Sequence, residues 1–121
     1  MVNILIVDDA SFMRGSLKYI VEMGGHQVVG MAKDGNEAIA MYKQFKPDIV
    51  TLDILMKGMD GITALKNIME LDPKAKVIMV TALGTDDKKE KSSSLGALGY
   101  IRKPFKQVEI IAEIEKVMKI K

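Results

Sequence analysis

The sequence predicts an α/β fold in which five parallel strands alternate with five helices. Short apolar runs of β-favouring residues recur along the chain, and longer amphipathic stretches separate them. This alternation is typical of repeated βα units, which place helices on both faces of a parallel sheet. The 121 residues are enough for one domain with a substantial core. We therefore expect one domain over residues 1–121, with no linker and no appended output domain.

The expected strands are short runs rich in valine, isoleucine and leucine. The second run contains Gly30, which favours either an edge position in the sheet or a less regular strand. The third run, Ile49 to Leu52, has few polar positions and is typical of a strand buried on both faces. The five expected strands cover residues 3–7, 26–31, 49–52, 77–80 and 99–103.

Terminal signals define the first two helices. Ser11 is expected to cap the first helix, which Gly24 and Gly25 end. Asp34, followed three residues later by Glu37, predicts the start of the second helix. Helical spacing assigns the buried faces to Met13, Leu17, Ile20 and Val21 in the first helix, and to Ala38, Ile39, Tyr42 and Phe45 in the second.

The last three helices differ in how strongly the sequence specifies them. Asp60 is expected to cap the third helix, which runs to about residue 71 before Asp72-Pro73. The fifth is expected over 105–118, with a stripe of isoleucine, valine and methionine. The fourth, over 85–96, is rich in lysine and contains three consecutive serines, which are mediocre helix formers. We expect it to be the least stable helix.

Four of the five apolar runs stop at polar residues. Asp8 and Asp9 follow the first run, Asp53 follows the third, Thr81 follows the fourth, and Lys103 lies at the end of the fifth. Ligands of such sheets bind beyond the carboxyl ends of the strands, where all these residues should lie. We therefore expect one site, with Asp53 at its centre.

Each of these residues also has a purely structural explanation when it is taken singly. Asp8, Asp9 and Asp53 are of a type that often caps helices or turns. Thr81 alone is more simply a structural hydroxyl, and Lys103 alone a solvated charge. The functional interpretation depends on their joint occurrence at one edge of the sheet.

Clustered carboxylates suit a small divalent cation and a phosphoryl group. Two carboxylates about 4 Å apart repel by ~4 kcal/mol at an effective dielectric near 20. Lys103 offsets part of that repulsion, and Mg²⁺, which prefers carboxylate oxygens and water, would offset much of the rest. The arrangement suits phosphoryl transfer to Asp53, with Lys103 and the Thr81 hydroxyl contacting the phosphoryl oxygens.

Together these residues resemble the receiver domains of two-component response regulators of the CheY-like type. The residues that carry the resemblance are Asp8-Asp9, Asp53, Thr81-Ala82 and Lys103-Pro104, together with the loop from Asp53 to Gly61, and the match spans essentially the whole chain. It implies a flavodoxin-like sheet in the order 2-1-3-4-5. The segment from Asp8 to Arg14 most resembles stand-alone chemotaxis regulators.

The resemblance also implies a role for each site residue. Asp53 would be the phosphoacceptor. Asp9, Asp53 and the Leu55 carbonyl would bind Mg²⁺ directly, and Asp8 would bind it through water. Thr81 and Lys103 would contact the phosphoryl group, and Tyr100 would be the switch aromatic. The Lys103-Pro104 peptide bond is expected to be cis. We also expect Leu55 and Leu83 to restrict water and slow hydrolysis of the aspartyl phosphate.

The expected function is a phosphorylation-activated switch. The domain would catalyse its own phosphorylation from a histidine kinase, and its own dephosphorylation, without being a conventional turnover enzyme. Output would be contact with a protein, such as a flagellar or archaellar motor component or its adaptor, through the fourth helix, fifth strand and fifth helix. The basic residues expected to attract an acidic partner there are Lys88, Lys89, Lys91, Arg102 and Lys106.

Four other functions compete with this one. An aspartyl hydrolase generally needs a second acid two residues after its nucleophile, where this chain has Leu55. A flavin module is disfavoured because Asp8 and Asp9 would repel the flavin phosphate. A phosphorelay intermediate and an unphosphorylated adaptor of the same fold remain open.

Composition narrows the location and the partners. The formal charge of +2 gives no indication of nucleic-acid binding, and the absence of cysteine excludes disulfides and thiolate metal sites. No apolar run is long enough to cross a membrane, and the N-terminus has none of the features of a signal peptide. We expect a cytoplasmic monomer.

Overall fold

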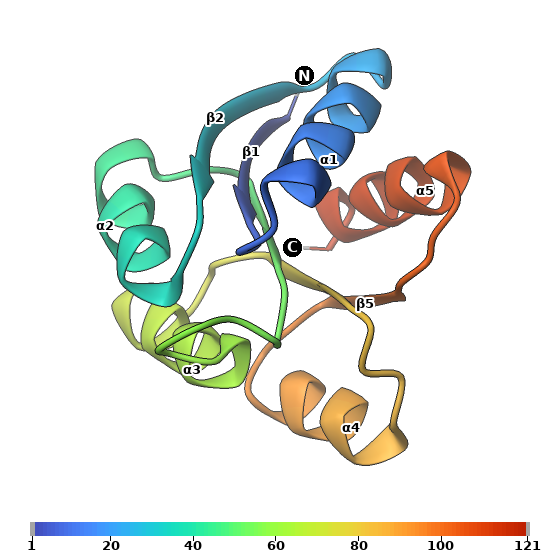
Figure 1. Cartoon of the computed structure of the whole chain (residues 1–121). Coiled ribbons are helices and arrows are strands. Elements are labelled where there is room, and N and C mark those ends of the chain that lie inside the picture. Colours follow the sequence, from blue (N-terminus) through green and yellow to red (C-terminus); the bar gives the residue numbers. More distant parts are fainter. Residues whose placement is uncertain (1, 121) are drawn as a thin grey trace.

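In the computed structural model, which describes residues 2–120, five parallel strands form one sheet in the order β2-β1-β3-β4-β5, as predicted. A helix follows each strand along the chain (Figure 1). The strands are β1 (Asn3–Val7), β2 (Gln27–Ala32), β3 (Ile49–Leu52), β4 (Val77–Thr81) and β5 (Gly99–Arg102). The helices are α1 (Ser11–Met23), α2 (Gly35–Phe45), α3 (Gly61–Leu71), α4 (Asp86–Ser94) and α5 (Gln107–Met118).

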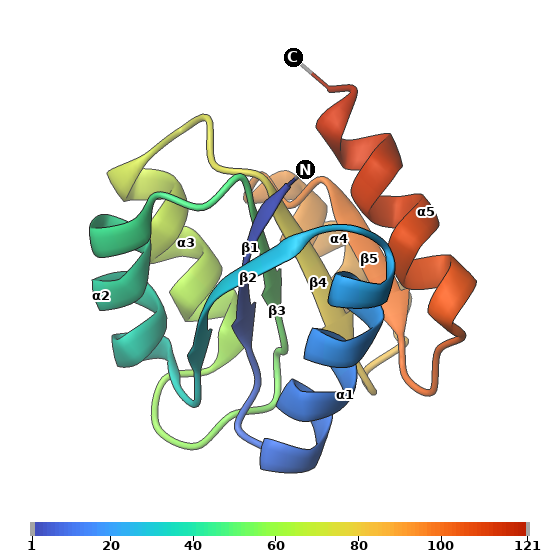
Figure 2. The same ribbon diagram turned by 90° about the horizontal axis from the view of Figure 1, so that it is seen from above.

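The helices cover both faces of the sheet. Helices α1 and α5 lie together on one face, and α2 and α3 lie on the other with α4 beside α3 (Figures 1 and 2). Each face therefore has its own apolar core. One core is built on Leu17 and Ile20 of α1 and Ile110 and Ile114 of α5, and the other on Ala38 of α2 and Ala64, Leu65 and Ile68 of α3.

The central strands are apolar because helices cover them on both sides. Every residue of β3 and β4 is buried, which confirms the sequence interpretation of the third run. Strand β2 is at the edge, as Gly30 indicated, and its register with β1 shifts between Ile4 and Leu5. Strand β2 is also the strand that adds no side chain to the predicted site.

Two of the predicted caps are confirmed. The Asp34 carboxylate accepts a hydrogen bond from the Glu37 N–H at 2.8 Å, and Asp60 accepts one from the Thr63 N–H at 2.9 Å. The prediction for Ser11 was wrong, because Ala10 occupies the N-cap position of α1 and Ser11 is the first helical residue.

Further details differ from the sequence predictions, including α4, which spans Asp86–Ser94 and not 85–96, and β5, which ends at Arg102 and not at 103. Phe45 was assigned to the buried face of α2 but is 40% exposed, because it is the last residue of that helix. Helix α5 begins at Gln107 rather than at Phe105. His26 precedes β2 instead of beginning it, and its Nδ1 accepts a hydrogen bond from the Val2 N–H at 3.3 Å.

Helix α4 is the least anchored of the five. Among its nine residues only Ser92 is buried, and the Ser92 hydroxyl donates to the Lys88 carbonyl within the same helix. Its packing against the rest of the domain is mainly against α3. The expectation of a weakly stabilised fourth helix therefore has a structural basis, because little apolar burial opposes its local opening.

Gly15 offers a test of the α1 surface. It lies in the middle of the helix, exposed, and a Cβ atom there would meet nothing within 4 Å. Gly15→Ala should raise the free energy of unfolding by about 0.5–1 kcal/mol, because alanine loses less backbone entropy in a helix. Urea denaturation, monitored by circular dichroism, measures the change in the free energy of unfolding.

Gly61→Ala is the opposing control. Its Cβ would collide with the Asp53 carbonyl oxygen and the Ile54 backbone, so this variant should be clearly destabilised. A Gly15→Ala protein less stable than the wild type would contradict the exposed helical setting of that residue.

Candidate functional site

The register of the sheet brings the predicted residues to one edge. Val7 of β1 pairs with Leu52 of β3, so the residues that follow, Asp8 and Asp53, lie side by side. The Asp53 N–H donates to the Val7 carbonyl at 3.1 Å, which continues the ladder to the site. Both carboxyl groups are almost fully buried, at 1% and 5% exposure of their residues.

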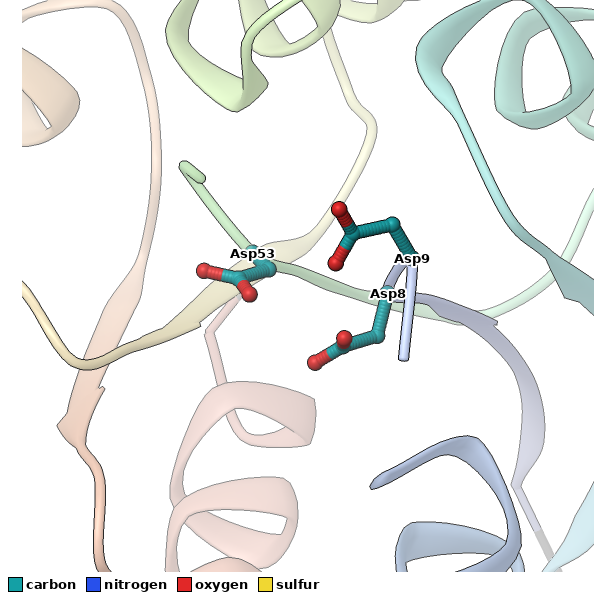
Figure 3. Close-up of side chains that lie close together, drawn as sticks. All are labelled: Asp8, Asp9 and Asp53. Carbon is teal, nitrogen blue, oxygen red and sulfur yellow. The ribbon is translucent and has the colours of Figure 1, made fainter. Parts of the chain in front are cut away.

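Three carboxylates meet there. Asp8, Asp9 and Asp53 each offer an oxygen, and these oxygens all lie within 4.8 Å of one another. Figure 3 shows the three side chains gathered around one space. Asp9 is exposed, unlike its two partners, so the cluster is open to solvent on its side. Three acids so close together repel one another unless cations are present.

Lys103 supplies one of those cations. Its Nζ donates to Asp8 Oδ2 at 2.7 Å and to Asp53 Oδ2 at 2.9 Å. Burial alone would lower the pKa of Lys103, but the hydrogen bonds to Asp8 and Asp53 and their negative charges outweigh it and raise the pKa. Lys103 therefore stays protonated at neutral pH. The Lys103-Pro104 peptide bond is cis, as expected.

Three further donors hold the two buried acids. The Ala10 N–H donates to Asp8 Oδ1 at 2.9 Å, and the Leu55 N–H donates to Asp53 Oδ1 at 3.2 Å. The Arg14 guanidinium, from α1, donates to the backbone carbonyl of Asp8 at 2.7 Å. Sequence reasoning missed Arg14, although a basic residue near a helix N-terminus, where the macrodipole disfavours it, was an available signal.

Thr81 and Tyr100 are connected through one residue of the β4–α4 loop. Thr81 is fully buried, and its hydroxyl accepts a hydrogen bond from the Leu83 N–H at 3.3 Å. The half-buried Tyr100 donates its hydroxyl to the Leu83 carbonyl. Burial raises the pKa of Tyr100, and the charges of Asp87 and Asp53 raise it further. The two predicted switch residues thus hold opposite ends of Leu83.

Comparison with known families decides the classification. A family model described as the response regulator receiver domain matches residues 4–115. The chain belongs to the response regulator receiver domain family. Receiver domains bind Mg²⁺ at an acidic pocket, and this receiver has the corresponding cluster of aspartates.

Individual relatives place this receiver among those of chemotaxis. It is 46% identical to the chemotaxis protein CheY of Thermotoga maritima over 97% of this chain and 98% of that protein. It is 41% identical to the CheY of Halobacterium salinarum, over 96% of each chain. A CheY in a CheX–CheY–BeF₃–Mg²⁺ complex from Borrelia burgdorferi superimposes with a TM-score of 0.94 at 42% identity, covering 96% of this chain and 88% of that one.

The receiver is thus of the chemotaxis response-regulator type, a class that signals through phosphorylation. Over residues 2–120, no helix is long and apolar enough to cross a membrane.

The crowding of acids has a measurable consequence without any metal. Asp9→Asn keeps the shape of the side chain and removes one of the three negative charges. In the presence of EDTA it should raise the free energy of unfolding by on the order of 1 kcal/mol, the repulsion of two charges about 4 Å apart in water. Thermal melts of the wild type and of Asp9→Asn at low salt measure this difference in stability.

Glu115→Gln is the matched control, since Glu115 is an exposed acid in the second half of α5. It should leave the melting temperature nearly unchanged. An equal shift in both variants would mean that net charge, and not the cluster, is responsible.

Proposed function

We propose that this receiver is a phosphorylation-activated switch that acts in the cytoplasm. It accepts a phosphoryl group on Asp53 from a histidine kinase in a Mg²⁺-dependent reaction, and then binds a downstream protein of the chemotaxis or motility system. The observation that carries this proposal is the placement of Lys103 between the buried Asp8 and Asp53, with Asp9 at the open side of the same cluster.

The donor set fits Mg²⁺. Asp8, Asp9 and Asp53 supply hard carboxylate oxygens, and we assign the Leu55 carbonyl as a further ligand because its residue already contacts Asp53 through its N–H. When bound, Mg²⁺ supplies positive charge next to the phosphoryl oxygens. The open side of the cluster, at Asp9, leaves room for water ligands.

The chain's own residues perform the transfer. A carboxylate oxygen of Asp53 attacks the phosphorus of the phosphohistidine donor, and a new O–P bond forms as the P–N bond breaks. The imidazole nitrogen keeps the electron pair of that bond and takes up a proton from solvent water. Lys103, already bound to Asp53 Oδ2, stabilises the negative charge of the phosphoryl oxygens, and Thr81 donates its hydroxyl to one of them.

The hydrogen bonds that link Thr81, Leu83 and Tyr100 would transmit the effect of phosphorylation from the site to β5. If the Thr81 side chain rotated so that its oxygen moved toward a phosphoryl group and away from Leu83, the Leu83 N–H would lose its acceptor. Leu83 would then move, and its carbonyl, which accepts the Tyr100 hydroxyl hydrogen bond in this structure, would move with it. Phosphorylation would in this way change the position of the β5 aromatic, a local charge event acting on an element with two arrangements.

We assign output to the face formed by α4, β5 and α5. A cavity of about 170 Å³ lies there, and Tyr100 forms part of its wall. The chemistry of the face favours an acidic segment of a partner, such as a flagellar or archaellar motor component or its adaptor, bound by a monomeric receiver. Of the basic residues predicted there, Lys89 lines this cavity. Lys88 and Lys91 instead line the cavity between the β3–α3 loop and α4.

Intact-protein mass spectrometry tests the proposed phosphorylation. Incubation with acetyl phosphate and Mg²⁺ should add the mass of one phosphoryl group. The addition should be lost in Asp53→Asn, which lacks the nucleophile, and in the wild type with EDTA. No addition in the wild type would favour an adaptor that works without phosphorylation, and an addition that persists in Asp53→Asn would exclude Asp53 as the acceptor.

Leu55 and Leu83 provide a second test, through the rate of dephosphorylation. Both line a cavity of about 600 Å³ between the β3–α3 loop and α4, and Leu55 is 52% exposed. Leu55→Asn should speed loss of the phosphoryl group by roughly tenfold, about 1.4 kcal/mol in the barrier, because a polar group there can orient water. Leu55→Met, which stays apolar, is the control. Equal rates in both variants and the wild type would refute the role of Leu55.

A further inference from the structure

Arg14 holds the loop that carries the first two acids. From the fourth position of α1, its guanidinium reaches back to the Asp8 carbonyl at 2.7 Å. A cation in the first turns of a helix is disfavoured by the macrodipole. Moreover, the helix cannot gain a side-chain cap from Ala10. Helix stability therefore does not account for Arg14, whereas its contact with the acidic loop does.

The contact fixes the one peptide unit of this loop that other bonds leave free. On one side, the Asp8 N–H donates to the Ala32 carbonyl at 3.1 Å. On the other, the Ala10 N–H is held by Asp8 Oδ1. The Asp8–Asp9 peptide lies between these two points, and the Arg14 bond sets the direction of its carbonyl.

The position of the Asp9 carboxylate depends strongly on the orientation of the Asp8–Asp9 peptide. Among the residues the structure describes, none donates a hydrogen bond to its carboxylate, and it is exposed. Its approach to the Asp8 and Asp53 oxygens is therefore determined by its backbone. A rotation of the Asp8–Asp9 peptide would swing the Asp9 side chain away from the cluster.

We propose that Arg14 is a positioning residue for the metal-binding loop: by holding the Asp8 carbonyl, it keeps the Asp9 carboxylate turned toward Asp8 and Asp53. The inference rests on the proposed function, because it assumes that these carboxylates bind Mg²⁺. The contact that carries this role is the hydrogen bond from Arg14 Nη1 to the Asp8 carbonyl, so Arg14 acts through the backbone of Asp8.

The direction in which Mg²⁺ affinity changes when Arg14 is removed distinguishes a positioning role from a purely electrostatic one. A guanidinium near a dication site repels the dication, so its removal should strengthen Mg²⁺ binding if charge were its only influence. If Arg14 positions the loop, its removal should weaken binding, as loss of outer-shell partners usually does, by about 10- to 100-fold.

The experiment is isothermal titration of MgCl₂ into four proteins. Arg14→Met keeps the stem and the helix propensity but has no donor. Arg14→Lys keeps a donor that can reach a single carbonyl. Lys18→Met makes the same change one turn further along α1, where the ammonium pairs with Glu22. Melts in EDTA check that each variant is folded.

The expected Kd for Mg²⁺ is about tenfold or more higher in Arg14→Met. It should return to near the wild-type value in Arg14→Lys and be unchanged in Lys18→Met. Wild-type or tighter binding by Arg14→Met, or an Arg14→Met protein unfolded in EDTA, would overturn the positioning role and leave the proposed function intact. A wild type that does not bind Mg²⁺ would overturn both.

Discussion

The ion pair of Lys103 with Asp8 and Asp53 is the interaction on which the functional edge of this domain depends. It joins the ends of β1, β3 and β5, three strands that the chain reaches at widely separated points. Removing Lys103 would leave two buried carboxylates without their cation. An unpaired charge in a setting with little water strongly destabilises the fold. The pair also leaves a net negative charge, since one ammonium faces three carboxylates. That imbalance is what makes the edge receptive to further positive charge.

The sheet makes this arrangement possible. Parallel strands all direct their carboxyl ends to the same edge, and the order β2-β1-β3-β4-β5 places the four polar strand ends next to one another. The apolar cores on both faces fix the strands, so the side chains beyond them have little freedom. A rigid scaffold with a crowded, incompletely neutralised edge is a suitable basis for a reversible charge switch.

Most of the helices and strands could be predicted because the sequence signals for them are local. The strand order came from the family resemblance instead. Asp34 and Asp60 cap helices through contacts three residues away, and apolar runs identify strands without knowledge of their partners. The polar strand ends were predictable for the same reason. The Arg14–Asp8 bond and the Thr81–Leu83–Tyr100 connection were not, since they depend on how a side chain crosses to another backbone. Phe45 misled the prediction because helical spacing says nothing about where the covering sheet ends.

Helix α4 has one consequence beyond its low stability. Because Ser92 alone is buried, nearly every other side chain of the helix is dispensable to the core. Its surface is therefore free to diverge without endangering folding. Duplicated genes could acquire distinct binding preferences by substitutions confined to this helix, while the acidic edge of the sheet stays unchanged. Such a separation would let one cell keep several pathways of this type insulated from each other.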